Sequence, residues 1–152
     1  MTSKTGHNGA VSAVTRSETI NANPQACFDA LIDFESYPSW QSAVSTAMIR
    51  ASDDTRGTVD VDFSVDLRIR KVRYALRYHL DGPSSLKWEL IDGDIRRVDG
   101  GYDLVEVSPG VTEASYTLDI DPGFPVPGLV RRRLISGSMS ESVRELKQRV
   151  EG

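Results

Sequence analysis

The chain is poor in the residues from which most catalytic and metal-binding sites are built. Its 152 residues include a single cysteine, Cys27, and two histidines, His7 and His79. One cysteine excludes an intramolecular disulfide and the cysteine-rich zinc motifs, and it is typical of a reducing cytoplasm. No metal-ligand motif and no glycine-rich phosphate loop occurs. We therefore predict no metal, no cofactor and no catalytic residue.

Long apolar runs and an excess of basic residues are also absent. No stretch of 18 apolar residues occurs, so no membrane-spanning helix is expected. The net charge of −4 is opposite in sign to that of a nucleic-acid-binding surface. Residues 1–13 are small and polar, which favours a disordered tail over a signal peptide. We expect a cytoplasmic protein, a monomer or weak dimer, with one domain over residues 14–152.

What the chain does contain is a regular alternation of apolar and polar residues. From Val59 to Arg70 every odd position is apolar and every even position is polar. This period of two predicts a strand with one buried face and one exposed face. The next segment repeats the alternation with opposite parity, as expected for the second strand of a tight hairpin. If Ile69 and Arg70 form its tip, Asp60 faces His79, and His79 is an exposed surface residue.

Further strands and helices follow from the same kind of pattern. Helical spacing of apolar residues marks a long C-terminal helix, with Ile135, Met139, Val143, Leu146 and Val150 on one side. The other elements are strands over residues 12–21, 44–51, 85–92, about 102–107 and 111–121, and two short helices within residues 24–40.

An apolar sheet face and an apolar helix stripe must bury against each other. The predicted fold class is therefore α+β. We expect a curved antiparallel sheet of six to seven strands wrapped around the C-terminal helix, with the two short helices after the first strand.

The opening segment carries a family resemblance. A strand ends at Ile20, Asn23 is placed to cap a helix that begins at Pro24, and the second short helix ends in Tyr37-Pro38-Ser39-Trp40. This order resembles the START-like (SRPBCC) superfamily, in particular its polyketide cyclase/dehydrase and coenzyme-Q-binding branches. The resemblance implies a helix-grip fold that encloses an apolar cavity, and a hydrophobic small molecule as the ligand.

The cavity candidates are the residues expected to face inward, although each of them would also serve as ordinary core packing. Four of them are tyrosines, whose buried hydroxyls need a partner that a water or a ligand carbonyl could supply. The candidates are Trp40, Phe63, Val65, Tyr74, Tyr78, Trp88, Tyr102, Tyr116, Leu118, Leu134 and Met139.

Two functions of different classes fit this arrangement. The first is non-catalytic binding or transport of an isoprenoid quinone, a lipid or a polyketide-like aromatic. The alternative is a polyketide aromatase/cyclase, which needs an ionisable group inside the cavity. The predicted inner face is nearly free of charged residues, and Glu106 is a doubtful exception. The residues available therefore favour the non-catalytic binding protein over the enzyme. A protein-interaction role with a collapsed cavity is a third possibility.

A basic cluster follows an apolar loop near the start of the long helix. Phe124, Val126 and Leu129 come directly before Arg131, Arg132 and Arg133. Apolar residues next to basic ones are typical of a peripheral membrane contact. The other interpretation is a solvated helix face, so membrane contact is one of two open alternatives at this point.

Overall fold

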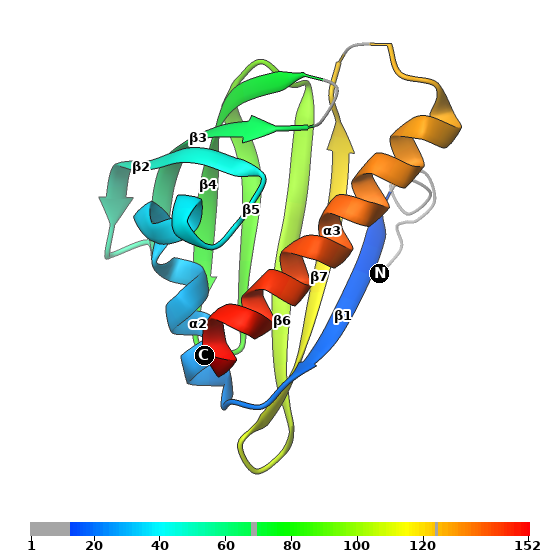
Figure 1. Cartoon of the computed structure of the whole chain (residues 1–152). Coiled ribbons are helices and arrows are strands. Elements are labelled where there is room, and N and C mark those ends of the chain that lie inside the picture. Colours follow the sequence, from blue (N-terminus) through cyan, green and yellow to red (C-terminus); the bar gives the residue numbers. More distant parts are fainter. Residues whose placement is uncertain (1–12, 68–69, 124) are drawn as a thin grey trace, which may run out of the picture.

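The structure is a computed structural model that describes residues 13–67, 70–123 and 125–152, with the side chains of Arg131 and Leu134 left out. In these residues a long helix lies across a seven-stranded antiparallel sheet (Figure 1). The elements are β1 (Val14–Ile20), α2 (Pro24–Ile32), η2 (Phe34–Ser39), β2 (Val44–Asp53), β3 (Thr58–Asp66), β4 (Lys71–Asp81), β5 (Ser85–Gly93), β6 (Arg97–Ser108), β7 (Val111–Asp121) and α3 (Gly128–Glu151).

This architecture confirms the predicted α+β helix-grip fold, including the two short helices after the first strand. The predicted tail, residues 1–13, lies outside the described residues except for Ala13. None of the described helices combines the length and the apolar character needed to cross a membrane.

The first short helix begins where its capping signal predicts. The Asn23 side chain accepts a hydrogen bond from the Ala26 N–H at 2.9 Å, and Pro24 takes the first helical position. Cys27, Phe28 and Leu31 are buried on one face of α2. Burial raises the pKa of the Cys27 thiol, which makes it a packed core residue with little thiolate character.

The strands pair with their neighbours in the sequence, except that β1 pairs with β7, so β1 and β2 are the two edges of the sheet. As predicted, the odd-numbered residues of β3 and the even-numbered residues of β4 face the same side of the sheet. Val61 lies opposite Leu76, and Phe63 lies opposite Tyr74. The predicted hairpin register, however, is wrong. Asp60 pairs with Arg77 rather than with His79.

The hairpin closes earlier than its sequence suggested. The Leu67 N–H donates to the Arg70 carbonyl at 3.0 Å, which shifts the loop toward β3. Ile69, expected at the tip, lies outside the described residues. In the observed register the Asp60 carboxylate accepts two hydrogen bonds from the Arg77 guanidinium, at 2.8 and 3.0 Å.

The long helix α3 packs across one face of the sheet, against β1 and β7, with its C-terminal end beside α2 (Figure 1). Met139, Val143 and Leu146 are buried on the side that faces the sheet. The first turn of α3 is different, because Leu129 and Val130 are 66% and 44% exposed. The helix is therefore anchored by its second half, and its first turns border the region described next.

Candidate ligand-binding cavity

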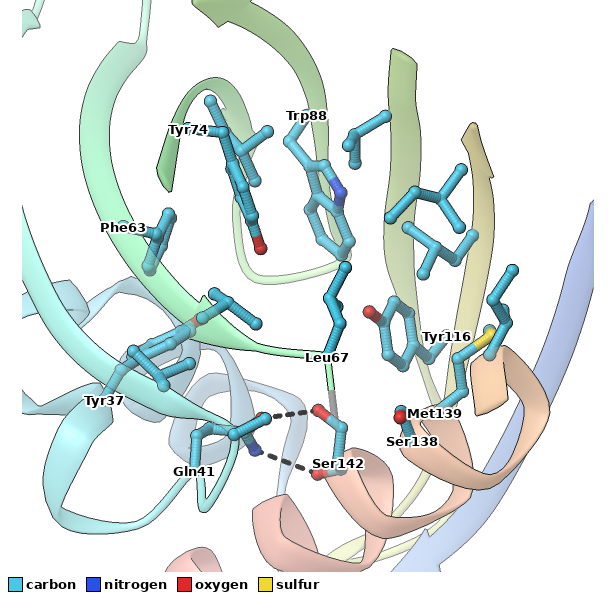
Figure 2. A pocket seen from close by; sticks show the side chains of 18 of the residues that line it. Tyr37, Gln41, Phe63, Leu67, Tyr74, Trp88, Tyr116, Ser138, Met139 and Ser142 are labelled. Atoms are coloured by element: carbon cyan, nitrogen blue, oxygen red, sulfur yellow. Dashed lines mark hydrogen bonds between the residues drawn. The ribbon is translucent and has the colours of Figure 1, made fainter. Parts of the chain in front are cut away.

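A cavity of about 180 Å³ lies between the inner face of the sheet, the segment around η2, and α3 (Figure 2). Every strand from β3 to β7 contributes to its wall, because inward positions on successive antiparallel strands lie side by side. Ile135, Ser138, Met139 and Ser142 of α3 form the opposite side. The apolar side of the sheet and the apolar stripe of the helix thus meet around a space that they do not completely fill.

The structure brings the sequence-predicted cavity residues together, apart from Leu134, whose side chain lies outside the described part of the chain. The predicted residues that line the cavity are Trp40, Phe63, Val65, Tyr74, Tyr78, Trp88, Tyr102, Tyr116, Leu118 and Met139. Together with Tyr37, the aromatic residues of this group form a continuous series of ring contacts. Trp88, for example, lies 5.4 Å from Tyr78 and 5.7 Å from Tyr116 between ring centroids.

Sequence reasoning missed the polar residues of the wall. Gln41, Asp66, Ser138 and Ser142 all line the cavity. Ser138 and Ser142 are four residues apart and flank Met139 on the apolar stripe of α3, so helical spacing could have found them. Gln41 follows the second short helix, where no periodic pattern exists, and its position could not have been read from the sequence. Tyr37, inside the second short helix, was also missed.

Gln41 and Ser142 form a reciprocal pair at the base of the cavity (Figure 2). The Ser142 hydroxyl donates to Gln41 Oε1 at 2.6 Å, and Gln41 Nε2 donates to the Ser142 backbone carbonyl at 3.0 Å. Gln41 is only 8% exposed. Next to it, the Ser42 N–H donates to the Glu145 carboxylate at 3.1 Å. These bonds fasten the segment before β2 to the middle of α3.

The tyrosines of the cavity differ in what their hydroxyls meet. Tyr37 donates to the Leu31 carbonyl at 2.6 Å, so its hydroxyl is engaged within the protein. The hydroxyls of Tyr74 and Tyr116 point into the cavity from opposite walls (Figure 2). Within the described part of the chain, neither of these two has a hydrogen-bond partner.

Burial keeps these phenols neutral. It raises the pKa of Tyr74 and of Tyr116, with the nearby Tyr116 phenol adding to the effect on Tyr74. It also raises the pKa values of Tyr37, Tyr78 and Tyr102, because a phenolate would lose its hydration inside the apolar wall. At neutral pH the tyrosines are therefore hydrogen-bonding groups and poor proton-transfer groups.

Charge is scarce in the cavity wall. Among the described lining residues Asp66 is the one with a charged side chain, and it is exposed at the end of β3. Glu106, the doubtful inward candidate, is exposed and accepts a hydrogen bond from the Gly110 N–H at 3.2 Å in the β6–β7 turn. His79 is exposed as expected, with its Nε2 2.9 Å from the Glu89 carboxylate.

The candidates for membrane contact lie at the start of α3 and just before it. Val126 lines the cavity and is half-buried, whereas Leu129 is exposed. Arg132 and Arg133 are also exposed. Phe124 and the side chain of Arg131 lie outside the described residues. The apolar loop end thus borders the cavity, and the exposed basic turn follows it along the chain.

A curved antiparallel sheet that grips a long C-terminal helix around an apolar cavity defines the START-like class of helix-grip domains. Comparison with known families agrees with this assignment. A sequence model of the family described as polyketide cyclase/dehydrase and lipid transport matches residues 12–151, and the chain belongs to that family. The coenzyme-Q-binding branch, which the opening segment also resembles, stays a prediction. No curated protein sequence matches the chain significantly.

Solved structures of similar fold come from several bacteria. A START superfamily protein from Mycobacterium smegmatis has a TM-score of 0.82 at 21% identity, covering 91% of this chain and 97% of that one. The ZhuI aromatase/cyclase from Streptomyces has a TM-score of 0.80 at 14% identity, covering 91% and 93%. A STAR-related lipid transfer protein from Xanthomonas axonopodis has a TM-score of 0.74 at 13% identity, and the match covers 92% of this chain and 86% of that one. At these identities the likeness shows the fold alone.

Proposed function

We propose that this protein binds and carries a hydrophobic small molecule, such as an isoprenoid quinone, a lipid or a polyketide-like aromatic, in the cavity between sheet and α3. The observation that carries the proposal is the lining itself. It consists mainly of aromatic and aliphatic side chains, with a few polar groups among them. This composition is typical of sites that bind small apolar ligands, in which polar groups set the orientation. Burial of apolar ligand surface contributes about 25 cal/mol per Å² before the opposing terms of binding.

The cavity volume limits how much of a ligand is enclosed. An apolar cavity of about 150 Å³ in another protein accommodates benzene. By that comparison a space of about 180 Å³ accommodates a ring-sized group. A long isoprenoid or acyl chain would have to extend out of this space, or the side chains around it would have to move apart.

The aromatase/cyclase alternative has weaker support. Such an enzyme transfers protons to and from a chain held in the cavity, which requires an acid or base with a pKa near neutrality. The buried phenols have raised pKa values, and the described lining includes no histidine. Asp66 is the remaining candidate and lies exposed at the rim. Turnover of a poly-β-ketone mimic that is lost in Asp66→Asn would favour the enzyme over the carrier.

A membrane surface is the second element of the proposal. Exposed Leu129 and Val130 precede exposed Arg132 and Arg133, and Val126 connects this turn to the cavity. Each basic residue near an anionic surface contributes about 1 kcal/mol. Docking of this turn on a membrane would let a lipid enter without crossing water.

Vesicle flotation tests the membrane contact. The protein should float with vesicles that contain phosphatidylserine and stay in solution with pure phosphatidylcholine. Charge reversal in Arg132→Glu/Arg133→Glu should abolish flotation, whereas Arg149→Glu at the other end of α3 should preserve it. Equal flotation of both variants would contradict the contact.

Ligand binding is tested by filling the cavity. Leu118 lines the wall on β7, and Leu118→Trp adds an indole to that space. In ¹⁵N-labelled protein, ethylbenzene should shift the indole N–H signals of Trp40 and Trp88, which both line the cavity, and Leu118→Trp should abolish this binding. Val105→Trp, at an exposed position of β6, is the control and should bind like the parent protein.

Native mass spectrometry after purification from the natural host, followed by organic extraction, would then identify a co-purifying molecule. Unchanged ethylbenzene affinity in folded Leu118→Trp would contradict the proposed location, and Tyr78→Trp provides a second variant if Leu118→Trp does not fold.

A further inference from the structure

Two phenol hydroxyls and one indole N–H of the cavity wall are hydrogen-bond donors without a partner among the described residues. The hydroxyls of Tyr74 on β4 and Tyr116 on β7 approach the same space from opposite walls (Figure 2). A phenol donates more readily than it accepts, because its oxygen lone pair is delocalised into the ring. Trp40 adds a third case, since its indole N–H is buried without a partner among the described residues, and an indole can only donate.

Three other polar side chains of the wall have partners within the protein. Tyr37 donates to the Leu31 carbonyl, and Gln41 and Ser142 bind each other. The hydroxyl proton of Ser142 is therefore not available to a ligand unless this internal bond breaks. The sheet thus offers a ligand the neutral hydroxyl donors of Tyr74 and Tyr116.

A negatively charged group would find no counter-ion here. None of the described lining residues is a lysine, arginine or histidine, and Asp66 at the rim is itself acidic. An ionised carboxylate that enters an apolar space unpaired loses its hydration at a large cost in free energy. Because burial raises the pKa of the phenols, they remain protonated donors at neutral pH and add no charge.

We infer that the cavity selects an uncharged ring that carries carbonyl or ether oxygens, accepts hydrogen bonds from Tyr74 and Tyr116, and is favoured over both a plain hydrocarbon ring and a ring carboxylate. The inference rests on the proposed binding function and narrows it. Among the candidate ligands it favours oxygenated rings such as quinones and aryl ketones, and it disfavours free fatty acids with their carboxylate inside.

Three single-ring probes of nearly equal size test this at pH 7: ethylbenzene, acetophenone and benzoate. Their affinities are measured by the shifts of the two indole N–H signals. Acetophenone should bind about three- to tenfold more tightly than ethylbenzene, which corresponds to one net hydrogen bond. Benzoate should bind at least tenfold more weakly than acetophenone.

Removal of the donors should remove the preference. Tyr74→Phe, Tyr116→Phe, or their combination should reduce acetophenone binding to the level of ethylbenzene, while ethylbenzene binding persists. Thr117→Val is the matched control, because it deletes a hydroxyl beside Tyr116 on the opposite face of β7, where Thr117 bonds Thr15. It should leave the ratio of the two affinities unchanged.

The outcomes separate the two proposals. Equal affinities for acetophenone and ethylbenzene, benzoate binding as tight as acetophenone, or an unchanged preference in folded Tyr74→Phe/Tyr116→Phe would overturn the donor inference and leave the binding function intact. If none of the three probes shifts the indole signals, the binding function itself fails. Each single variant provides the test if the double variant does not fold.

Discussion

At the scale of single residues, the shape of the cavity depends on a residue without a side chain. Gly100 occupies an inward position of β6, between buried Val98 and Tyr102, and lies opposite Trp88 of β5. A Cβ atom at Gly100 would lie 2.7 Å from Trp88 Nε1 and 2.8 Å from the Thr117 carbonyl oxygen. The indole therefore occupies the space that a side chain would otherwise take.

We predict that Gly100→Ala moves Trp88 toward the cavity. The backbone carbonyl of Thr117 cannot easily yield, so the variant should lose on the order of 1–3 kcal/mol of unfolding free energy, and it should bind ethylbenzene more weakly. Urea denaturation and the indole N–H shifts measure the two effects.

Gly137→Ala is the control, because a Cβ at this exposed position of α3 meets nothing within 4 Å. It should stabilise by about 0.5–1 kcal/mol through helix propensity. Equal stability of Gly100→Ala and the parent would contradict this account.

At the scale of elements, the Gln41–Ser142 pair connects two parts of the chain that are 101 residues apart. The segment between η2 and β2 is short and irregular, so its own backbone bonds do not fix it against α3. The reciprocal bonds of Gln41, together with those of Ser42 to Glu145 and Glu141, supply that attachment. One wall of the cavity is thereby held in place by polar contacts at its base.

Ser142→Ala should destabilise the fold by about 1–3 kcal/mol, because it leaves the buried Gln41 Oε1 without its donor. Chemical denaturation gives the free energy, and amide hydrogen exchange of residues 40–43 should accelerate more than that of the central strands. Ser140→Ala, two positions earlier in the same helix, serves as the control and should be neutral or slightly stabilising. Uniform acceleration across the sheet would show that the pair does not act locally.

At the scale of the whole molecule, all five tyrosines of the chain line one cavity. Each has a raised pKa, and burial is the first cause in every case. In the unfolded chain a tyrosine titrates near pH 10. Above that pH the unfolded chain has released phenol protons that the folded protein still binds, so folding stability must fall as the pH rises.

We therefore predict that the buried tyrosines make their full contribution to folding stability below about pH 10, and that the unfolding free energy falls steeply above this pH. Phenolate absorbance should rise together with loss of the folded circular dichroism signal, and not before it. Tyr74→Phe should reduce the slope of the unfolding free energy against pH by the amount expected for about one proton. Phenolate formation in protein that is still folded at about pH 10.5 would show that the hydroxyls are not shielded as the structure indicates.

The fold of the molecule also limits what its relatives can tell. A START superfamily protein shares this fold at 21% identity, and so does an aromatase/cyclase at 14%. A scaffold that tolerates such divergence positions a cavity, whereas the side chains in the cavity decide which ligand is bound. The arguments for a neutral ligand therefore rest on Tyr74, Tyr116 and the absence of a basic residue among the described lining.

Much of the candidate site was accessible from local patterns. The alternation along β3 and β4 assigned Phe63, Tyr74 and Tyr78 to the inner face, and the structure has them in the cavity wall. The spacing along α3 did the same for Met139. Register was not accessible in this way, because parity is unchanged when a hairpin slips by two residues. The pairing of Asp60 with Arg77 was therefore missed.

By itself, then, the sequence determined the order of the elements, their buried faces and the apolar character of what they enclose, because the periods of strand and helix are local properties of the backbone. Only the tertiary structure decided which polar groups meet. It paired Gln41 with Ser142, engaged the Tyr37 hydroxyl and left those of Tyr74 and Tyr116 directed into the cavity. Such pairings depend on distances between residues far apart in the chain, which exist only once the sheet has curved around the helix.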